Sequence, residues 1–184
     1  MESKILVLDI ETTGFDHRRD CILELGMVEL DLTTGEVKEL FDERFKEAHL
    51  SARHHNAWIF ANGFMDHDDV RGALSLNNYK SEIQQILDRY RNRITAWNRP
   101  FDIDFLKSRG FDFGKDIPDP MRESTKYFRL TKRNGSCCKW PTAQEAWDKL
   151  FPEIVKIEKH RGLDDAVMEA RIIYQLVNRG VYLV

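Results

Sequence analysis

The sequence lacks several features that would assign it to a membrane or secreted class. No apolar run approaches the roughly 20 residues that a membrane-spanning helix needs. The chain start has no apolar core of a secretory signal. The three cysteines, Cys21, Cys137 and Cys138, cannot all pair and lack the spacing of a structural zinc site. We therefore expect a soluble cytoplasmic protein with reduced thiols and no membrane contact.

An excess of charge of one sign is also missing. The chain has 28 basic and 31 acidic residues, for a formal net charge of −3. The chain therefore lacks the overall positive charge that would indicate a nucleic-acid-binding protein. Any polyanionic substrate must be held by local groups. The 184 residues are enough to bury a core of their own. We expect one domain spanning residues 1–184.

The order of the expected elements indicates the fold class. A buried strand is expected at residues 4–8, and a hairpin at 22–45 with its turn at 33–36, so the first three strands should be antiparallel. Residues 46–79 show only short helical fragments. Further elements are expected at 81–90 (capped by Ser81), 94–97 (a strand), 99–109, 122–130, 142–151 and 163–178. The pattern predicts an α/β domain with a mixed central sheet flanked by helices.

Two acids, Asp9 and Glu11, follow the first strand and are separated by one residue. If the strand continues, their side chains emerge on the same face. At about 4 Å and an effective dielectric of about 20, two like charges repel by roughly 4 kcal/mol, which a divalent cation would relieve. Hard oxygen ligands favour Mg²⁺ or Mn²⁺ over zinc. Taken alone, the pair is more often a solvated strand end.

Helical spacing separates inward from outward acids at two further places. Asp102 shares a helix side with Phe105 and Leu106, whereas Asp104 shares one with Lys107. Asp102 should therefore point inward and Asp104 toward solvent, although an acid at a helix start is often only a cap or a surface charge.

The last helix gives the same contrast. Asp165 shares a side with Met168 and Ile172, whereas Asp164 shares one with Arg171. His160 is five residues before Asp165, about 140° away on an ideal helix, so it should lie on the preceding loop. There its reference pKa near 6.5 would suit a proton acceptor, although a lone histidine is usually structural or exposed.

Together, the motifs Leu-Asp-Ile-Glu-Thr-Thr-Gly, Asn-Arg-Pro-Phe-Asp and His-Arg-Gly-Leu-Asp-Asp-Ala resemble the DEDDh 3′-to-5′ exonucleases. The resemblance covers most of the chain to Tyr174 except residues 46–79. It implies a ribonuclease-H-like α/β fold and a metal-dependent enzyme that hydrolyses DNA or RNA from a free 3′ end. The products would be nucleoside 5′-monophosphates.

The resemblance also implies roles for individual residues. Asp9, Glu11, Asp102 and Asp165 would hold two Mg²⁺ or Mn²⁺ ions, and His160 would be the general base. The related subfamily with a tyrosine has it four residues before the last Asp, where this chain has Arg161. Residues implied to bind substrate are Thr12, Thr13, Phe101 and Asn98.

One departure from the family concerns a His-Gly-Ile-like element after the third strand. Its closest counterpart here is Asn62-Gly63-Phe64. A basic stretch from Lys126 to Lys139, with aromatic residues between the cations, is compatible either with guiding a nucleic-acid strand or with a solvated loop.

Two rival functions stay open from the sequence. One is a binding module for nucleic acid or a protein partner that keeps the fold without chemistry, and the other is a metal-dependent endonuclease. The presence of all five expected site residues argues against the first, and the position of His160 argues against the second. The expected partner is a single strand or a 3′ end. A polymerase partner is compatible with the sequence but not indicated by it, so we expect a stand-alone enzyme.

Overall fold

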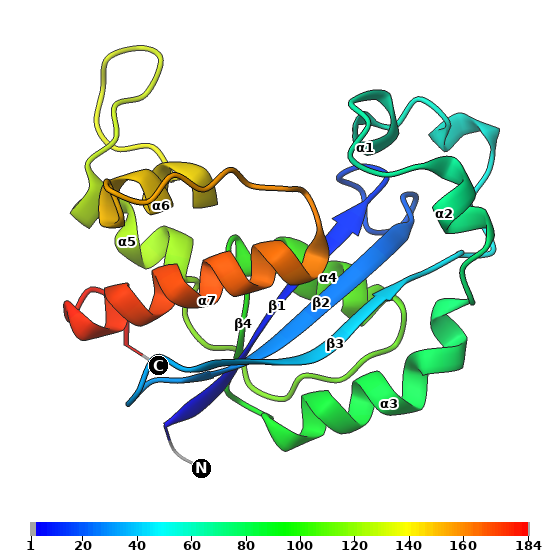
Figure 1. Ribbon diagram of the computed structural model, residues 1–184, viewed down its shortest axis with the longest axis horizontal. Helices are drawn as coiled ribbons and strands as arrows, with labels where there is room; N and C mark the ends of the chain where they lie inside the picture. The colour runs from blue at the N-terminus through cyan, green and yellow to red at the C-terminus, as the bar shows by residue number, and fades with distance from the viewer. Residues whose placement is uncertain (1–2, 184) are drawn as a thin grey trace.

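Four strands form one mixed sheet in the computed structural model, which describes residues 3–183 (Figure 1). They are β1 (Lys4–Thr12), β2 (Ile22–Asp31), β3 (Val37–Arg44) and β4 (Ile94–Thr95). Their order is β3-β2-β1-β4. The first three are antiparallel neighbours, as expected, and β4 runs parallel to β1. The predicted α/β class with a mixed sheet is confirmed.

Helices cover both faces of the sheet (Figure 1). The longer ones are α3 (Leu76–Arg89), α4 (Arg99–Ser108), α5 (Pro120–Phe128), α6 (Ala143–Leu150) and α7 (Gly162–Asn178). The predicted capping box of α6 is present: Thr142 Oγ1 accepts from Glu145 N at 3.1 Å, and Thr142 N donates to Glu145 Oε2 at 3.0 Å. No helix within residues 3–183 is long and apolar enough to span a membrane.

The start predicted for α3 is wrong. Its N-cap is Ser75, whose Oγ accepts from Asn77 N at 3.3 Å. Ser81 lies inside the helix, where its Oγ accepts from Gln85 Nε2. The apolar face begins earlier than its spacing suggested, because Leu76 is buried and Tyr79 packs edge-on against Phe41.

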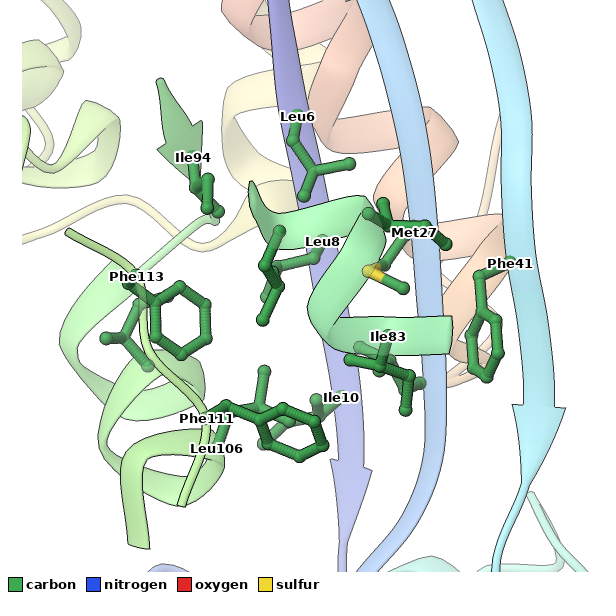
Figure 2. Close-up of a cluster of buried hydrophobic side chains, with 14 of the residues drawn as sticks. Leu6, Leu8, Ile10, Met27, Phe41, Ile83, Ile94, Leu106, Phe111 and Phe113 are labelled. Atoms are coloured by element: carbon green, nitrogen blue, oxygen red, sulfur yellow. The ribbon is translucent and has the colours of Figure 1, made fainter. Parts of the chain in front are cut away.

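Alternation along β1 distributes its side chains between two cores. Leu6, Leu8 and Ile10 pack on the α3 and α4 side, where Figure 2 shows them beside residues of both helices. Ile5 and Val7 pack on the α7 side. Because side chains alternate with period two, Asp9 and Glu11 continue the row that faces α7.

Residues 46–79, where the sequence indicated only short helical fragments, form three short helical pieces beyond the end of the sheet and then the first turn of α3. The three pieces are η1 (Ala52–His54), α1 (Trp58–Ala61) and α2 (His67–Arg71). It has a small core in which Ile59, Met65 and Val70 pack against Cys21 and Leu23 of the main fold. Buried Glu47 also ties it down, because its carboxylate accepts from Ile22 N and pairs with Arg109, both at 2.8 Å. The segment is therefore a fixed part of one end of the molecule.

Of the three cysteines, Cys21 is free and buried. Cys137 and Cys138 are neighbours in the loop before α6, with their sulfur atoms side by side. That all three thiols are reduced stays a prediction.

Candidate active site

A close backbone contact places the start of α7 against β1 and β2. A Cβ atom on Gly162 would lie 2.7 Å from Gly26 N and 3.2 Å from Asp9 O. Gly26 is also the register partner of Asp9 across the β1–β2 pair. The absence of side chains at Gly26 and Gly162 lets the helix start within van der Waals distance of the strand that carries Asp9 and Glu11.

The four predicted acids converge at this end of the sheet. Asp102 is 2% exposed and Asp165 is 3% exposed, whereas Asp104 is exposed and Asp164 is partly exposed. The predicted orientations of these two helix faces are therefore confirmed. Asp102 Oδ1 accepts from Ile10 N at 3.1 Å, which fixes α4 to β1 between Asp9 and Glu11. Asp9, Glu11 and Asp165 line one pocket, and Asp102 is not among its lining residues.

His160 lies on the loop before α7, as predicted, and this loop wraps around Asp165. The Asp165 carboxylate accepts from Lys159 N at 3.2 Å and from Arg161 N at 2.9 Å, on either side of the histidine. His160 itself adopts a left-handed conformation with φ of 54°. Such a conformation is uncommon outside glycine and is retained only where neighbouring contacts hold it. Ligand atoms of His160, Glu11 and Asp165 all lie within 4.8 Å of one another.

Two aromatic rings from the 46–79 segment pack on His160. Trp58 lies edge-on with ring centroids 4.7 Å apart, and Phe64 does so at 4.3 Å. Burial lowers the pKa of His160, an effect that the charge of Asp165 opposes. The histidine is therefore favoured in its neutral form, the form that accepts a proton.

Burial and mutual repulsion raise the pKa values of the acids. Burial raises the pKa of Asp9 well above its usual range, with further contributions from Glu169 and Asp102. Burial, followed by the charge of Asp165, raises the pKa of Glu11 to about 9. The pKa values of Asp102 and Asp165 are raised as well, again chiefly by burial. Without a cation, so many carboxylates can share this space only by holding protons.

The structure adds two acids that the sequence motifs did not identify. Glu169, one turn after Asp165 on α7, is 4% exposed and accepts from Trp97 N at 3.0 Å. Burial, with the charge of Asp102, raises its pKa well above the usual range. Glu158 lines the pocket, and burial with the charge of Asp165 raises its pKa to about 7. Glu169 had a sequence signal, since it is four residues from Asp165 on the same inward face.

A buried carboxylate outside the pocket anchors the His160 loop. Glu24 on β2 is fully buried and pairs with Arg161 Nε, 3.0 Å from each of its oxygens. It also accepts from Gly162 N at 2.9 Å and pairs with Arg44 of β3 at 3.1 Å. One side chain thus fixes the residue after His160 and the first residue of α7 to the sheet.

The pocket between these elements has a volume of about 320 Å³, within the range of small-molecule sites. All four residues predicted to bind substrate line it: Thr12, Thr13, Asn98 and Phe101. The Thr13 hydroxyl accepts from Cys21 N at 2.9 Å, and the Thr12 hydroxyl donates to Gly14 O at 2.7 Å. The pocket wall also includes Phe15, which is 91% exposed, and Trp58, which is 55% exposed.

The donor set fits a hard divalent cation. Carboxylate oxygens dominate it, and no cysteine lines the pocket. A cation would replace the protons that the crowded acids otherwise retain, and oxygen donors are those that Mg²⁺ and Mn²⁺ prefer.

Comparison with known proteins decides the family. The family model described as "Exonuclease", RNase_T, matches residues 6–173. The chain belongs to this exonuclease family. The exonuclease family predicted from the three sequence motifs is thus confirmed.

Curated relatives are longer proteins. The exonuclease is 23% identical over 175 residues to "DNA polymerase III PolC-type" of Clostridium perfringens, a match that covers 94% of this chain and 11% of the relative. The chain therefore spans about a ninth of the length of that relative.

Solved structures share the fold of the exonuclease. The nuclease domain of 3′hExo, described as a DEDDh family member bound to rAMP, superposes with a TM-score of 0.69 at 18% identity. That match covers 99% of this chain and 95% of the other. Exonuclease I of E. coli, in complex with a dT13 oligonucleotide, gives a TM-score of 0.72 at 13% identity and covers 96% and 41%. The predicted ribonuclease-H-like fold is confirmed.

Proposed function

We propose that this protein is a 3′-to-5′ exonuclease that hydrolyses phosphodiester bonds from a free 3′ end and releases nucleoside 5′-monophosphates. One observation carries the proposal: Glu11, Asp165 and His160 place their ligand atoms within 4.8 Å of one another in a pocket that also contains Asp9. This arrangement pairs a carboxylate site for cations with a proton acceptor, the two components that metal-assisted hydrolysis needs.

The proposed cofactor is two Mg²⁺ or Mn²⁺ ions per site, held by Asp9, Glu11, Asp102 and Asp165. When bound, such ions lower the pKa of water and neutralise charge on the phosphate. Asp102 Oδ1 is committed to Ile10 N. We therefore propose that Asp102 contributes through its other carboxylate oxygen.

The residues of the chain hold the reactants and move one proton. A ring nitrogen of His160 accepts the proton of the attacking water, because the imidazole is kept neutral and beside the acids. Trp58 and Phe64 hold the plane of that ring. Phe15 and Phe101, with ring centroids 6.1 Å apart, offer faces on which a terminal base can stack. The backbone at Thr12 and Thr13, together with Asn98, borders the place for the sugar.

The proposed substrate is single-stranded nucleic acid or a 3′ end, because the aromatic pocket wall suits an unpaired base. The nuclease domain of 3′hExo was solved with rAMP bound, and Exonuclease I with a dT13 oligonucleotide. Both ribose and deoxyribose substrates therefore belong in the test. The proposed location is the cytoplasm. The curated relatives are polymerases, so a polymerase partner is a second setting for the same activity.

The test uses 5′-end-labelled single-stranded DNA, single-stranded RNA and recessed duplexes with Mg²⁺ or Mn²⁺. We expect a ladder of products that shorten from the 3′ end, which a chelator abolishes and Asp9→Ala eliminates. A circular single strand, which has no end, should remain intact.

Other outcomes would point to the rival functions. Cleavage of the circle would identify an endonuclease. Binding of the strands without any shortening, equal in the wild type and in Asp9→Ala, would identify a binding module without chemistry.

A further inference from the structure

A basic segment, residues 122–140, begins within α5 and continues into the loop before α6, and this loop projects from the molecule (Figure 1). We call the segment the basic arm. It holds six basic residues and one acid, Glu123, in a chain whose net charge is −3. Its outer part is a hairpin, closed by the bridge between Thr131 and Cys137 and by the bond from Lys132 N to Ser136 O at 2.8 Å. The basic residues are Arg122, Lys126, Arg129, Lys132, Arg133 and Lys139.

Most of these cations have no anionic partner within the protein. Lys139 pairs with Glu145, and Arg122 lies 3.4 Å from Asp119. The remaining four, Lys126, Arg129, Lys132 and Arg133, are exposed and form no ion pair with any residue in 3–183. A group of unpaired cations on one projection is a local site for a polyanion, which the net charge of the chain conceals.

Exposed aromatic rings accompany the cations. Trp140 is 57% exposed, and the Arg122 guanidinium lies over its ring at 5.0 Å. Tyr127 is 43% exposed, and its hydroxyl accepts from Arg179 at 3.1 Å. Rings of this kind interleaved with cations suit unpaired bases as well as phosphates, which favours a single strand over a duplex.

The base of the arm is attached to the rim of the active-site pocket. Trp97 Nε1 donates to Pro141 O at 3.0 Å, and the next residue, Asn98, lines the pocket. Glu158, another lining residue, donates its backbone N–H to Gln144 Oε1 at 2.9 Å. The arm and the linker between α6 and α7 lie on the same side of the sheet in Figure 1. The residues that directly follow the arm are therefore bonded to one side of the pocket rim, on the side of the sheet where the arm also lies.

We propose that the basic arm binds the single strand upstream of its 3′ end, through phosphate contacts of the exposed cations and base stacking on Trp140. This proposal rests on the proposed exonuclease function. The arm then controls affinity for long strands and leaves the chemistry at the 3′ end to the pocket.

The test compares two substrates that differ in reach. A dinucleotide fills only the pocket, whereas a strand of about twenty nucleotides also covers the arm. For Lys132→Gln with Arg133→Gln, we expect KM for the long strand to rise roughly tenfold at about 0.1 M salt, with kcat unchanged. The dinucleotide kinetics should not change. Arg89→Gln with Lys115→Gln, two exposed cations elsewhere, is the matched control and should behave as the wild type.

The dependence of strand binding on salt concentration and on Trp140 provides an independent measurement that needs no catalysis. Binding of the long strand is followed by fluorescence anisotropy in the presence of a chelator. If Lys132 and Arg133 each contact one phosphate, the double variant should lower the slope of log Kd against log salt by about 1.4. Trp140→Ala should weaken binding with no change in that slope, since stacking releases no counterions.

If the Lys132→Gln, Arg133→Gln variant lost activity equally on the dinucleotide and on the long strand, the arm would act through the fold and not through strand binding. An unchanged KM and Kd for the long strand would also overturn the proposal. If the wild type degrades neither substrate, the proposed exonuclease function fails. The anisotropy series then still decides whether the arm binds a strand.

Discussion

At the residue scale, Glu24 is the side chain that holds the His160 loop in position. It is fully buried on β2 and receives Arg161 from the His160 loop and Arg44 from β3. A buried carboxylate with two cationic partners is stabilising only while the partners remain, because removal of one leaves its charge poorly compensated. The two arginines pair with the same carboxylate from different elements, β3 and the loop before α7.

This arrangement gives a matched pair of variants. Arg161→Ala and Arg44→Ala should each lower the free energy of unfolding by about 2 kcal/mol, measured by urea denaturation. Only Arg161→Ala should lower kcat, by roughly tenfold and with little change in KM, because it releases the backbone that holds His160 and Asp165. An equal fall of kcat in both variants would show that the pair supports the fold alone.

Residue-scale prediction from the sequence was effective wherever periodicity applied. Spacing alone separated Asp102 from Asp104 and Asp165 from Asp164. It could not find Trp58 and Phe64, because their contact with His160 joins segments about 100 residues apart and depends on tertiary packing. Glu169 was not predicted because it lies outside the three sequence motifs.

At the element scale, the contact of Gly26 with Gly162 sets how closely α7 approaches the sheet. A Cβ on Gly162 would meet backbone on β2 and β1, which cannot move as a flexible side chain can. We expect Gly162→Ala to displace the start of α7, to lower the free energy of unfolding by about 1–3 kcal/mol and to reduce kcat. Denaturant unfolding and steady-state kinetics measure both effects.

Gly72→Ala is the control for this substitution. Its Cβ would lie 3.5 Å from Asp68 O, an ordinary contact, and the residue has a helical conformation. The free energy of unfolding should change by no more than about 0.5 kcal/mol. If Gly162→Ala were equally harmless, the close approach of α7 would not be what positions Asp165.

Elements with regular patterns were predicted well, and irregular ones were not. The β2–β3 hairpin and α6 each carry local signals in turn residues or a capping box, and both form as expected. The α3 boundary failed because two serines, Ser75 and Ser81, both suit an N-cap and tertiary packing selects between them. Residues 46–79 have short helices whose stability comes from contact with β2, a source that no local pattern reveals.

At the scale of the whole molecule, Glu29 links stability to pH. Its carboxylate pairs with Lys4 of β1 at 2.6 Å and accepts from the hydroxyl of Tyr90, which follows α3. The hydrogen bond from Lys4, followed by that from Tyr90, lowers the pKa of Glu29. Because the folded pKa lies below the unfolded value of about 4.3, the contribution to stability is fully present above that pH.

The contribution is lost as the pH falls through the folded pKa of Glu29. Glu29→Gln should therefore flatten the decline of Tm below about pH 4.5 and lower Tm at neutral pH, and the effect should be small because the pair is partly solvated. Thermal melts from pH 3 to 7 measure this difference. A constant offset between the two proteins across that range would show that the carboxylate charge is not responsible.

The acidic cluster joins β1, α4 and α7, so its occupancy should govern the stability of the whole molecule. A cation that binds only the folded cluster stabilises the protein by linkage, by about 2.7 kcal/mol at 100 times its dissociation constant. For a chain of this size, such a gain corresponds to a rise in Tm of roughly 5–11 °C. We expect Mg²⁺ or Mn²⁺ to raise Tm in differential scanning fluorimetry, and no rise at saturating metal would argue against a preformed cluster.

Asp102→Asn should greatly reduce the rise in Tm, whereas Asp104→Asn, which changes an exposed acid on the same helix, should leave it intact. Equal rises in both variants would place the stabilising cation away from Asp102, and the two-ion assignment of the four acids would then be wrong.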